Sequence, residues 1–260
     1  MTKTVEIGSV KFGGPEFVVV AGPCSVESKE QFQSTADFVQ SQGACALRGG
    51  LFKLRTDPSS FQGLGVNAYQ LAKEVKESLG LPFISEITDP RQMGDLEDVV
   101  DAYQVGSRNM HNYALLKELG QSSKPVLLKR GLAALFKEWI LAAEHVAKSG
   151  NDKIILCERG IRTFETSTRN TMDLNSLALA KKETHFPVLA DPSHGTGRAD
   201  LVTPLALAAA AAGADGLLLE VHPNPPQALS DGFQSLDFSQ FENLMKQLRS
   251  LLPAMDRTLS

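Results

Sequence analysis

Short apolar runs alternate with amphipathic stretches along almost the whole chain, and this alternation strongly limits the folds available to it. The runs are FVVVAG from Phe17, ACALR from Ala44, PFISE from Pro82, AYQVG from Ala102, PVLLK from Pro125, KIILC from Lys153, PVLAD from Pro187 and GLLLEV from Gly216. Apolar runs without polar alternation are typical of strands buried on both faces of a parallel sheet. Helices are expected between them at 29–42, 66–79, 91–96, 112–119, 133–148, 174–182, 201–212 and 238–251. Eight strand–helix units within 260 residues predict an α/β fold, a (β/α)8 TIM barrel.

A doubly wound open sheet is the alternative, because alternation of strands and helices alone does not exclude it. No glycine-rich phosphate fingerprint follows the first run, and Gly195-Thr196-Gly197 comes late and lacks the third glycine, so the barrel is favoured. The segment VEIGSVKF, with Gly8-Ser9 as its turn, predicts a short N-terminal hairpin. Because no linker or low-complexity tract interrupts the series, we expect a single catalytic barrel domain over 1–260, with 1–15 as the hairpin extension.

The charge of the chain argues against two classes of partner. Lysine and arginine number 26 against 30 aspartate and glutamate, a net charge of −4, so no bulk attraction for nucleic acid or an anionic membrane is expected. The longest apolar stretch, 201–221, is broken by Pro204, Gly213 and Asp215, which does not suit a membrane span. Three cysteines give no disulfide framework and favour a reducing compartment. We therefore expect a cytoplasmic protein.

Charged side chains stand at the ends of most predicted strands, where barrel enzymes carry their active sites. A single cation at such a position is usually a solvated loop residue. Strand parity changes this interpretation, because Leu127 and Lys129 share a face, so an apolar interior at Leu127 directs Lys129 into the mouth of the barrel. Several cations in one mouth predict a substrate with more than one anionic group. The candidates are Arg48, Lys53, Arg108, Lys129 and Arg159.

A second set of residues combines one thiol, one imidazole and two carboxylates: Cys24, His194, Glu220 and Asp231. Taken singly, Cys24 is typical of a buried small residue, and His194 is typical of a hydrogen-bonding loop residue. Together the four donors are compatible with a divalent ion such as Mn, Fe, Co or Zn. Their spacing is not a motif in itself, because the fold has to bring three strand ends together.

Several longer strings occur in a fixed order along the whole chain. They are AGPCSVES (21–28), LRGGLFKLRT (47–56), FQGLG (61–65), VGSRNM (105–110), PVLLKRG (125–131), ILCERGIRTFET (155–166), DPSHGTGR (191–198) and EVHPNPPQALSDG (220–232). In these strings the chain resembles the 3-deoxy-D-arabino-heptulosonate 7-phosphate synthase family, in its short bacterial and archaeal form without a regulatory domain. The resemblance implies a metal-dependent barrel, a homo-oligomer (dimer or tetramer), that condenses phosphoenolpyruvate with erythrose 4-phosphate in the first step of the shikimate pathway to aromatic amino acids.

The resemblance also implies roles for single residues. The metal ligands would be Cys24, His194, Glu220 and Asp231. Arg48 and Lys53 would hold the carboxylate and reacting centre of phosphoenolpyruvate, with Lys53 as proton donor or acceptor. The phosphate of phosphoenolpyruvate would be bound by Arg108, Lys129 and Arg159. Glu86 would be a further polar residue of the same site.

The aldose would be bound by Arg55 and Thr56, in a segment where the chain departs from the family pattern. The usual Lys-Pro-Arg-Thr is here Lys53-Leu54-Arg55-Thr56, and loss of the proline is expected to loosen the loop. The related synthase of 3-deoxy-D-manno-octulosonate 8-phosphate, which uses arabinose 5-phosphate, typically carries Ala-Asn-Arg-Ser after the lysine. Arg55 therefore favours the shorter aldose.

Two further alternatives belong to other classes of protein. A Schiff-base aldolase would use Lys129 as its nucleophile. A non-catalytic barrel would bind phosphorylated metabolites without turnover. The motif match favours the synthase over both.

Overall fold

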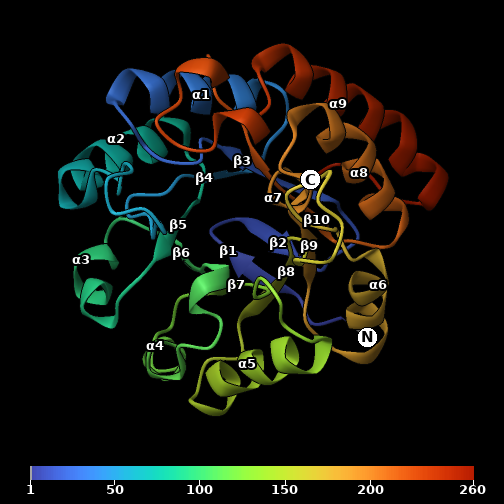
Figure 1. The fold of residues 1–260 in the computed structure, drawn as a ribbon, viewed down its shortest axis with the longest axis horizontal. Coiled ribbons are helices and arrows are strands. Elements are labelled where there is room, and N and C mark those ends of the chain that lie inside the picture. Colours follow the sequence, from blue (N-terminus) through green and yellow to red (C-terminus); the bar gives the residue numbers. More distant parts are fainter. Residues whose placement is uncertain (1) are drawn as a thin grey trace.

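In a computed structural model that describes residues 2–260, eight parallel strands close into a barrel in the order β10-β3-β4-β5-β6-β7-β8-β9 (Figure 1). The strands are β3 (Val18–Gly22), β4 (Ala46–Arg48), β5 (Phe83–Ile87), β6 (Ala102–Val105), β7 (Val126–Lys129), β8 (Ile154–Glu158), β9 (Val188–Ala190) and β10 (Gly216–Glu220). Each lies within or across one predicted apolar run. The predicted TIM barrel is confirmed, and the open sheet is excluded because β10 pairs with both β9 and β3.

Helices connect successive strands on the outside of the barrel (Figure 1). They are α1 (Lys29–Ser41), α2 (Tyr69–Leu79), α3 (Met93–Leu96), α4 (Tyr113–Leu119), α5 (Phe136–Lys148), α6 (Leu174–Glu183), α8 (Ala199–Ala211) and α9 (Phe238–Leu251). The helix predicted from residue 133 begins at Phe136, because Leu135 is extended and its N–H donates to Glu138 at 2.7 Å. One short helix, α7 (Pro192–Thr196), was not predicted; Asp191 caps it by accepting from the His194 N–H at 3.0 Å.

Alternate residues of each strand enter two separate cores. The inward core holds Leu127 and Leu218 with the other small and branched residues of the barrel interior, whereas Leu128 and Leu219 pack outward against the helices. Lys129 lies two residues after Leu127 and is 3% exposed. The parity prediction is therefore confirmed: inward apolar residues fill the barrel, and the charged residues that follow them reach its mouth.

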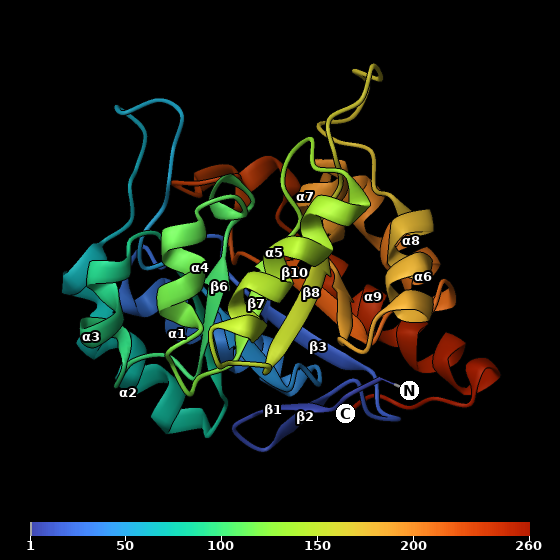
Figure 2. The ribbon, with the colours of Figure 1, turned by 90° about the horizontal axis from the view of Figure 1, so that it is seen from below.

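The N-terminal hairpin closes the other end of the barrel. Strands β1 (Val5–Ile7) and β2 (Val10–Phe12) pair antiparallel, as predicted. Their apolar side chains, including Ile7 and Phe12, are buried in the same cluster as the inward barrel residues. Figure 2 shows the hairpin below the strands, with the loop near residue 55 and the loop near residue 165 projecting from the opposite end. No helix within residues 2–260 is both long and apolar enough to span a membrane.

Candidate active site and metal centre

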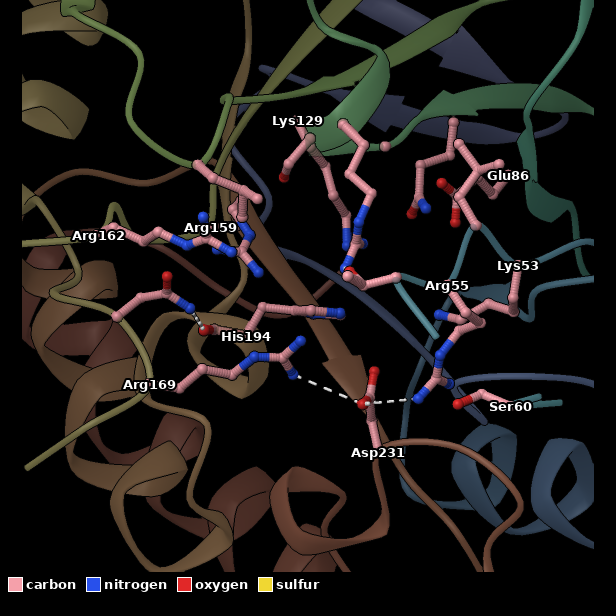
Figure 3. Close-up of a pocket in the computed structure, with 18 of the residues that line it drawn as sticks. Lys53, Arg55, Ser60, Glu86, Lys129, Arg159, Arg162, Arg169, His194 and Asp231 are labelled. Carbon is pink, nitrogen blue, oxygen red and sulfur yellow. Dashed lines mark hydrogen bonds and ion pairs between the residues drawn. The ribbon is translucent and has the colours of Figure 1, made fainter. Parts of the chain in front are cut away.

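A cavity of about 430 Å³ opens at the carboxyl ends of the strands. It is lined by eight cationic side chains and three carboxylates. The cations are Arg48, Lys53, Arg55, Arg108, Lys129, Arg159, Arg162 and Arg169, and the carboxylates are Asp57, Glu86 and Asp231. In Figure 3 the labelled side chains of this set, such as Arg55, Arg159 and Asp231, converge from opposite sides on one space. All five strand-end cations predicted from the sequence therefore line a single cavity.

Arg159 is the most unusual of these cations. It is only 3% exposed, yet within residues 2–260 no carboxylate forms an ion pair with it, and its Nε is buried without a hydrogen-bond partner. Burial lowers the pKa of Arg159 below its ordinary value, despite the opposing field of Asp191. A buried cation without a counter-ion is costly, and that cost is offset when an anion binds beside it.

Other unpartnered atoms surround the same space. Buried side-chain atoms that lack a hydrogen-bond partner include Nε of Arg48 and Nη1 of Arg55. Buried polar groups in native proteins are nearly always satisfied, so such a concentration in one cavity indicates a polar ligand. The donors are guanidinium groups, which suit carboxylate and phosphate oxygens.

Two of the strand-end cations do have buried partners. Nζ of Lys129 donates to Oδ2 of Asp191 at 2.7 Å, and Nη1 of Arg48 donates to Oε1 of Glu220 at 2.9 Å. These pairs fix the two cations on the floor of the cavity. The Lys129–Asp191 contact also disfavours the Schiff-base alternative, because it holds Nζ of Lys129 against a buried carboxylate instead of leaving it free to attack a carbonyl carbon.

The predicted metal ligands lie together beside the cavity. The ligand atoms of Cys24, Glu220 and Asp231 all lie within 4.8 Å of one another. His194 adjoins this group, with its Nε2 3.5 Å from Oε1 of Glu220. Since bonds to a divalent ion are about 2.0–2.3 Å long, two ligands of one ion lie roughly 3–4.5 Å apart, so these residues fit a metal centre.

The protonation states of the cluster determine what an ion would have to displace on binding. Burial lowers the pKa of His194 to about 4 against the fields of Asp191 and Glu220, so its imidazole is neutral at pH 7. Its Nδ1 lies 2.7 Å from Oδ2 of Asp191, although the geometry is not that of a hydrogen bond. Burial, reinforced by Glu220, raises the pKa of the Cys24 thiol to about 11. An ion would therefore have to displace the thiol proton as it binds.

Close backbone packing makes room for these groups. A side chain at Gly22 would place its Cβ 2.0 Å from the carbonyl oxygen of Arg48, so only glycine lets β3 and β4 approach as they do. At Gly106 the close contact is with a side chain instead, because a Cβ there would lie 2.0 Å from Oε1 of Glu86 and would push that carboxylate aside. Glu86 is accordingly able to face the cavity from β5.

The residues predicted to bind the aldose lie at the rim. Oγ1 of Thr56 accepts from Nη2 of Arg108 at 3.5 Å, and Nη2 of Arg55 lies 3.9 Å from Oδ1 of Asp231. Asp231 also lies 3.6 Å from Nη1 of Arg169, so it stands between two arginines (Figure 3). The loop that follows β4 therefore contacts the candidate metal ligands at Asp231.

A family model described as the DAHP synthetase I family matches residues 3–255 of this chain. The chain belongs to that family. A DAHP synthetase I assignment agrees with the resemblance found in the sequence motifs, which is thereby confirmed.

Known relatives of this DAHP synthetase I chain carry two kinds of name. The phospho-2-dehydro-3-deoxyheptonate aldolase of Thermotoga maritima is 47% identical over 96% of this chain and 74% of its own length. The 2-dehydro-3-deoxyphosphooctonate aldolase of Geobacter sulfurreducens is 31% identical over 96% of this chain and 98% of its own length. A crystal structure of the Thermotoga maritima DAHP synthase superposes with a TM-score of 0.96 at 46% identity, and covers 100% of this chain and 76% of that one.

Several polar residues of the DAHP synthetase I cavity, among them Gln104, Arg162 and Arg169, were missed in the sequence. Gln104 lies two residues after Ala102, an inward residue of β6, so strand parity alone was sufficient to find it. Arg162 and Arg169 belong to the long loop between β8 and α6. Loop residues have no periodicity that predicts direction, and no sequence signal distinguished these arginines from solvated ones.

Proposed function

We propose that this chain condenses phosphoenolpyruvate with erythrose 4-phosphate and water to give 3-deoxy-D-arabino-heptulosonate 7-phosphate and phosphate. The observation that carries the proposal is Arg159, a buried cation that has no carboxylate partner among residues 2–260 and lies in a cavity lined by eight cations. Such a cavity suits two phosphorylated anions at once. Family membership supports the reaction, which opens the shikimate pathway to aromatic amino acids.

Phosphoenolpyruvate would occupy the floor of the cavity. Arg159 and Lys129, with Arg108 at the rim, would bind its phosphate, and Arg48 its carboxylate. Arginine and lysine there offset the repulsion between two anionic substrates and align the methylene carbon with the aldehyde. Much of the catalysis would therefore be positioning.

Lys53 would act as proton donor at the reacting centre. Its Nζ lies 3.1 Å from Sγ of Cys24, beside the metal cluster. Burial by itself would lower the pKa of Lys53, but Cys24, Glu86 and Glu220 together raise it above the ordinary value. An ammonium group donates, so Lys53 would deliver a proton to the oxygen that becomes negative when the carbon–carbon bond forms.

Cys24, His194, Glu220 and Asp231 would hold a divalent ion, of which Mn, Fe, Co and Zn are candidates. When bound, such an ion supplies Lewis acidity, either to the aldehyde oxygen or to the attacking water. His194 is neutral at pH 7, as a metal ligand has to be. The cations Arg48 and Lys53 help to hold the pKa of the Glu220 carboxyl well below its ordinary range against the effect of burial, so Glu220 is ionised, as ligation needs.

Arg55 and Thr56 would select the aldose by binding its phosphate at the rim. The experiment is an assay of phosphate release with phosphoenolpyruvate and either erythrose 4-phosphate or arabinose 5-phosphate, with and without a chelator. We expect turnover with erythrose 4-phosphate that excess chelator abolishes and Mn²⁺ restores. Preference for arabinose 5-phosphate would identify a 3-deoxy-D-manno-octulosonate 8-phosphate synthase instead. Binding of phosphoenolpyruvate without turnover would indicate a non-catalytic barrel.

The thiol among the proposed ligands fits a reducing, cytoplasmic setting. The chain would work there as a dimer or tetramer, with 1–260 as one catalytic unit. Light scattering of the purified protein tests the oligomeric state.

A further inference from the structure

Glu220 is held from three directions at the edge of the metal cluster. Its Oε1 accepts from Arg48, as described above, and its Oε2 accepts from Nε2 of Gln234 at 2.7 Å. Its backbone N–H donates to Oγ of Ser193 at 3.0 Å. Gln234 and Ser193 are fully buried and do not line the cavity. Neither residue is a candidate metal ligand or a proposed substrate contact.

Ser193 replaces a strand partner that β10 lacks at this point. The pairing of β10 with β9 ends at Leu217 and Ala190, so the N–H of Glu220 extends beyond β9. A buried backbone donor needs an acceptor, and Ser193 supplies one from α7. Because His194 is the next residue, this hydrogen bond ties the strand that carries Glu220 to the helix that carries His194.

Gln234 fixes the direction in which the Glu220 carboxylate points. Its amide oxygen accepts from Nη1 of Arg169 at 2.7 Å. Since a guanidinium group can only donate, the amide NH₂ of Gln234 has to face Glu220. Oε2 of Glu220 is thereby occupied, whereas Oε1 faces His194.

The same short turn also places the other carboxylate. Gln234 ends the 3-10 turn η5 (Gly232–Gln234), which begins directly after Asp231. Asp231 has a left-handed backbone, with φ of 47°, which is uncommon for a residue other than glycine. One turn thus sets Asp231 by its backbone and Glu220 through the amide of Gln234. Strained conformations of this kind persist where the surrounding structure fixes them.

We propose that Gln234 and Ser193 are positioning residues of the divalent-metal centre, which hold Glu220 in the orientation needed for ligation. The inference rests on the proposed function, because it takes the cluster to be a metal site. Neither residue touches substrate or ion; each acts through Glu220. Outer contacts of this kind fix ligand geometry before the ion arrives and so raise its affinity.

The test measures Mn²⁺ affinity of the metal-free protein by competition with a chromophoric chelator. Gln234→Met keeps the side-chain volume but removes the hydrogen bond to Glu220, and Ser193→Ala removes only the hydroxyl. A matched control is Gln70→Met, because Gln70 donates to Glu74 at 2.9 Å on the exposed face of α2. We expect Gln234→Met to weaken Mn²⁺ binding about 10- to 100-fold, Ser193→Ala to weaken it less, and Gln70→Met to leave it unchanged.

A second readout separates positioning from loss of fold. The visible absorption of the Co²⁺-loaded protein reports ligand geometry, and we expect it to change in both buried variants while circular dichroism of the metal-free proteins does not. If Gln234→Met does not fold, Ser193→Ala decides the matter alone. Mn²⁺ affinity within about twofold of the parent in the folded variants, with an unchanged Co²⁺ spectrum, overturns the inference. A parent protein that binds no Mn²⁺ and forms no product overturns the proposed function instead.

Discussion

The two halves of the cavity are built differently. The floor is made of strand-end residues, Arg48, Lys129 and Arg159, which are nearly fully buried. The rim is made of Arg55, whose side chain is 22% exposed, and of the exposed Arg108 and Thr56. Strand ends of a closed barrel are held by neighbours on both sides, whereas a projecting loop is held at its ends only. The difference indicates that the floor is preformed, whereas the rim is adaptable.

The largest effect is expected where the two halves meet, at the proposed metal centre. Cys24→Ala removes the thiol donor and should abolish detectable turnover, because an ion would keep only the ligands supplied by His194, Glu220 and the Asp231 turn. Phosphate release, measured with excess Mn²⁺, checks the result. Full activity in metal-free Cys24→Ala would remove the ion from the mechanism.

Arg159→Met tests whether holding Arg159 buried in the floor lowers the stability of the free protein. Loss of the guanidinium should raise the activation free energy that kcat/KM for phosphoenolpyruvate reports by about 2–5 kcal/mol, which lowers kcat/KM roughly 30- to 5,000-fold. The free protein should become more stable, because a buried cation without a counter-ion is replaced by an apolar side chain. Steady-state kinetics and thermal unfolding check both effects; a variant that loses stability would contradict the account of Arg159.

Arg55→Ala tests the rim separately. Loss of a charge-assisted hydrogen bond to the aldose phosphate should cost about 1.5–3 kcal/mol, which raises the KM for erythrose 4-phosphate roughly 10- to 150-fold. Binding of phosphoenolpyruvate, followed by calorimetry, should change little because its proposed partners other than Arg108 lie on the floor. Equal losses for both substrates would show that the two halves are not independent.

The metal centre should also respond to pH in a defined direction. The pKa of the Cys24 thiol is about 11 and that of His194 about 4, so between these values ion binding releases one proton, from Cys24. Affinity for Mn²⁺ should therefore rise with pH, by about tenfold per unit between pH 7 and 9. Calorimetry in buffers of different ionisation enthalpy measures the proton count; a count near zero would contradict the protonated thiol.

The smallest effect is expected from restoring the family proline. Leu54→Pro should reduce the freedom of the unfolded loop and stabilise the protein by about 0.4–1 kcal/mol. A stiffer rim should lower the KM for erythrose 4-phosphate a few-fold and leave phosphoenolpyruvate unaffected. A destabilised variant would show that Leu54 adopts a backbone conformation closed to proline.

Much of the site could be predicted because strands impose a direction on their side chains. Lys129 follows Leu127 by two residues, and a barrel interior at Leu127 is enough to direct Lys129 to the mouth. Loops impose no such rule, so Arg162 and Arg169 were not distinguished from solvated residues. Gln234 was equally invisible, since its role depends on a contact with Glu220 fourteen residues away.

The sequence by itself determined the barrel, its hairpin and the direction of the strand-end cations, because these depend on periodicities of two and on apolar runs that are local properties of the chain. Only the tertiary structure decided which charges find partners. Lys129 and Arg130 are adjacent and equally cationic, yet Lys129 enters the cavity, whereas Arg130 turns outward into a buried pair with Glu158 at 2.9 Å. Arg159 remains without a carboxylate partner in the part of the chain that the structure covers, residues 2–260. Such pairing depends on closure of the strands into a ring, which brings together residues far apart in the chain.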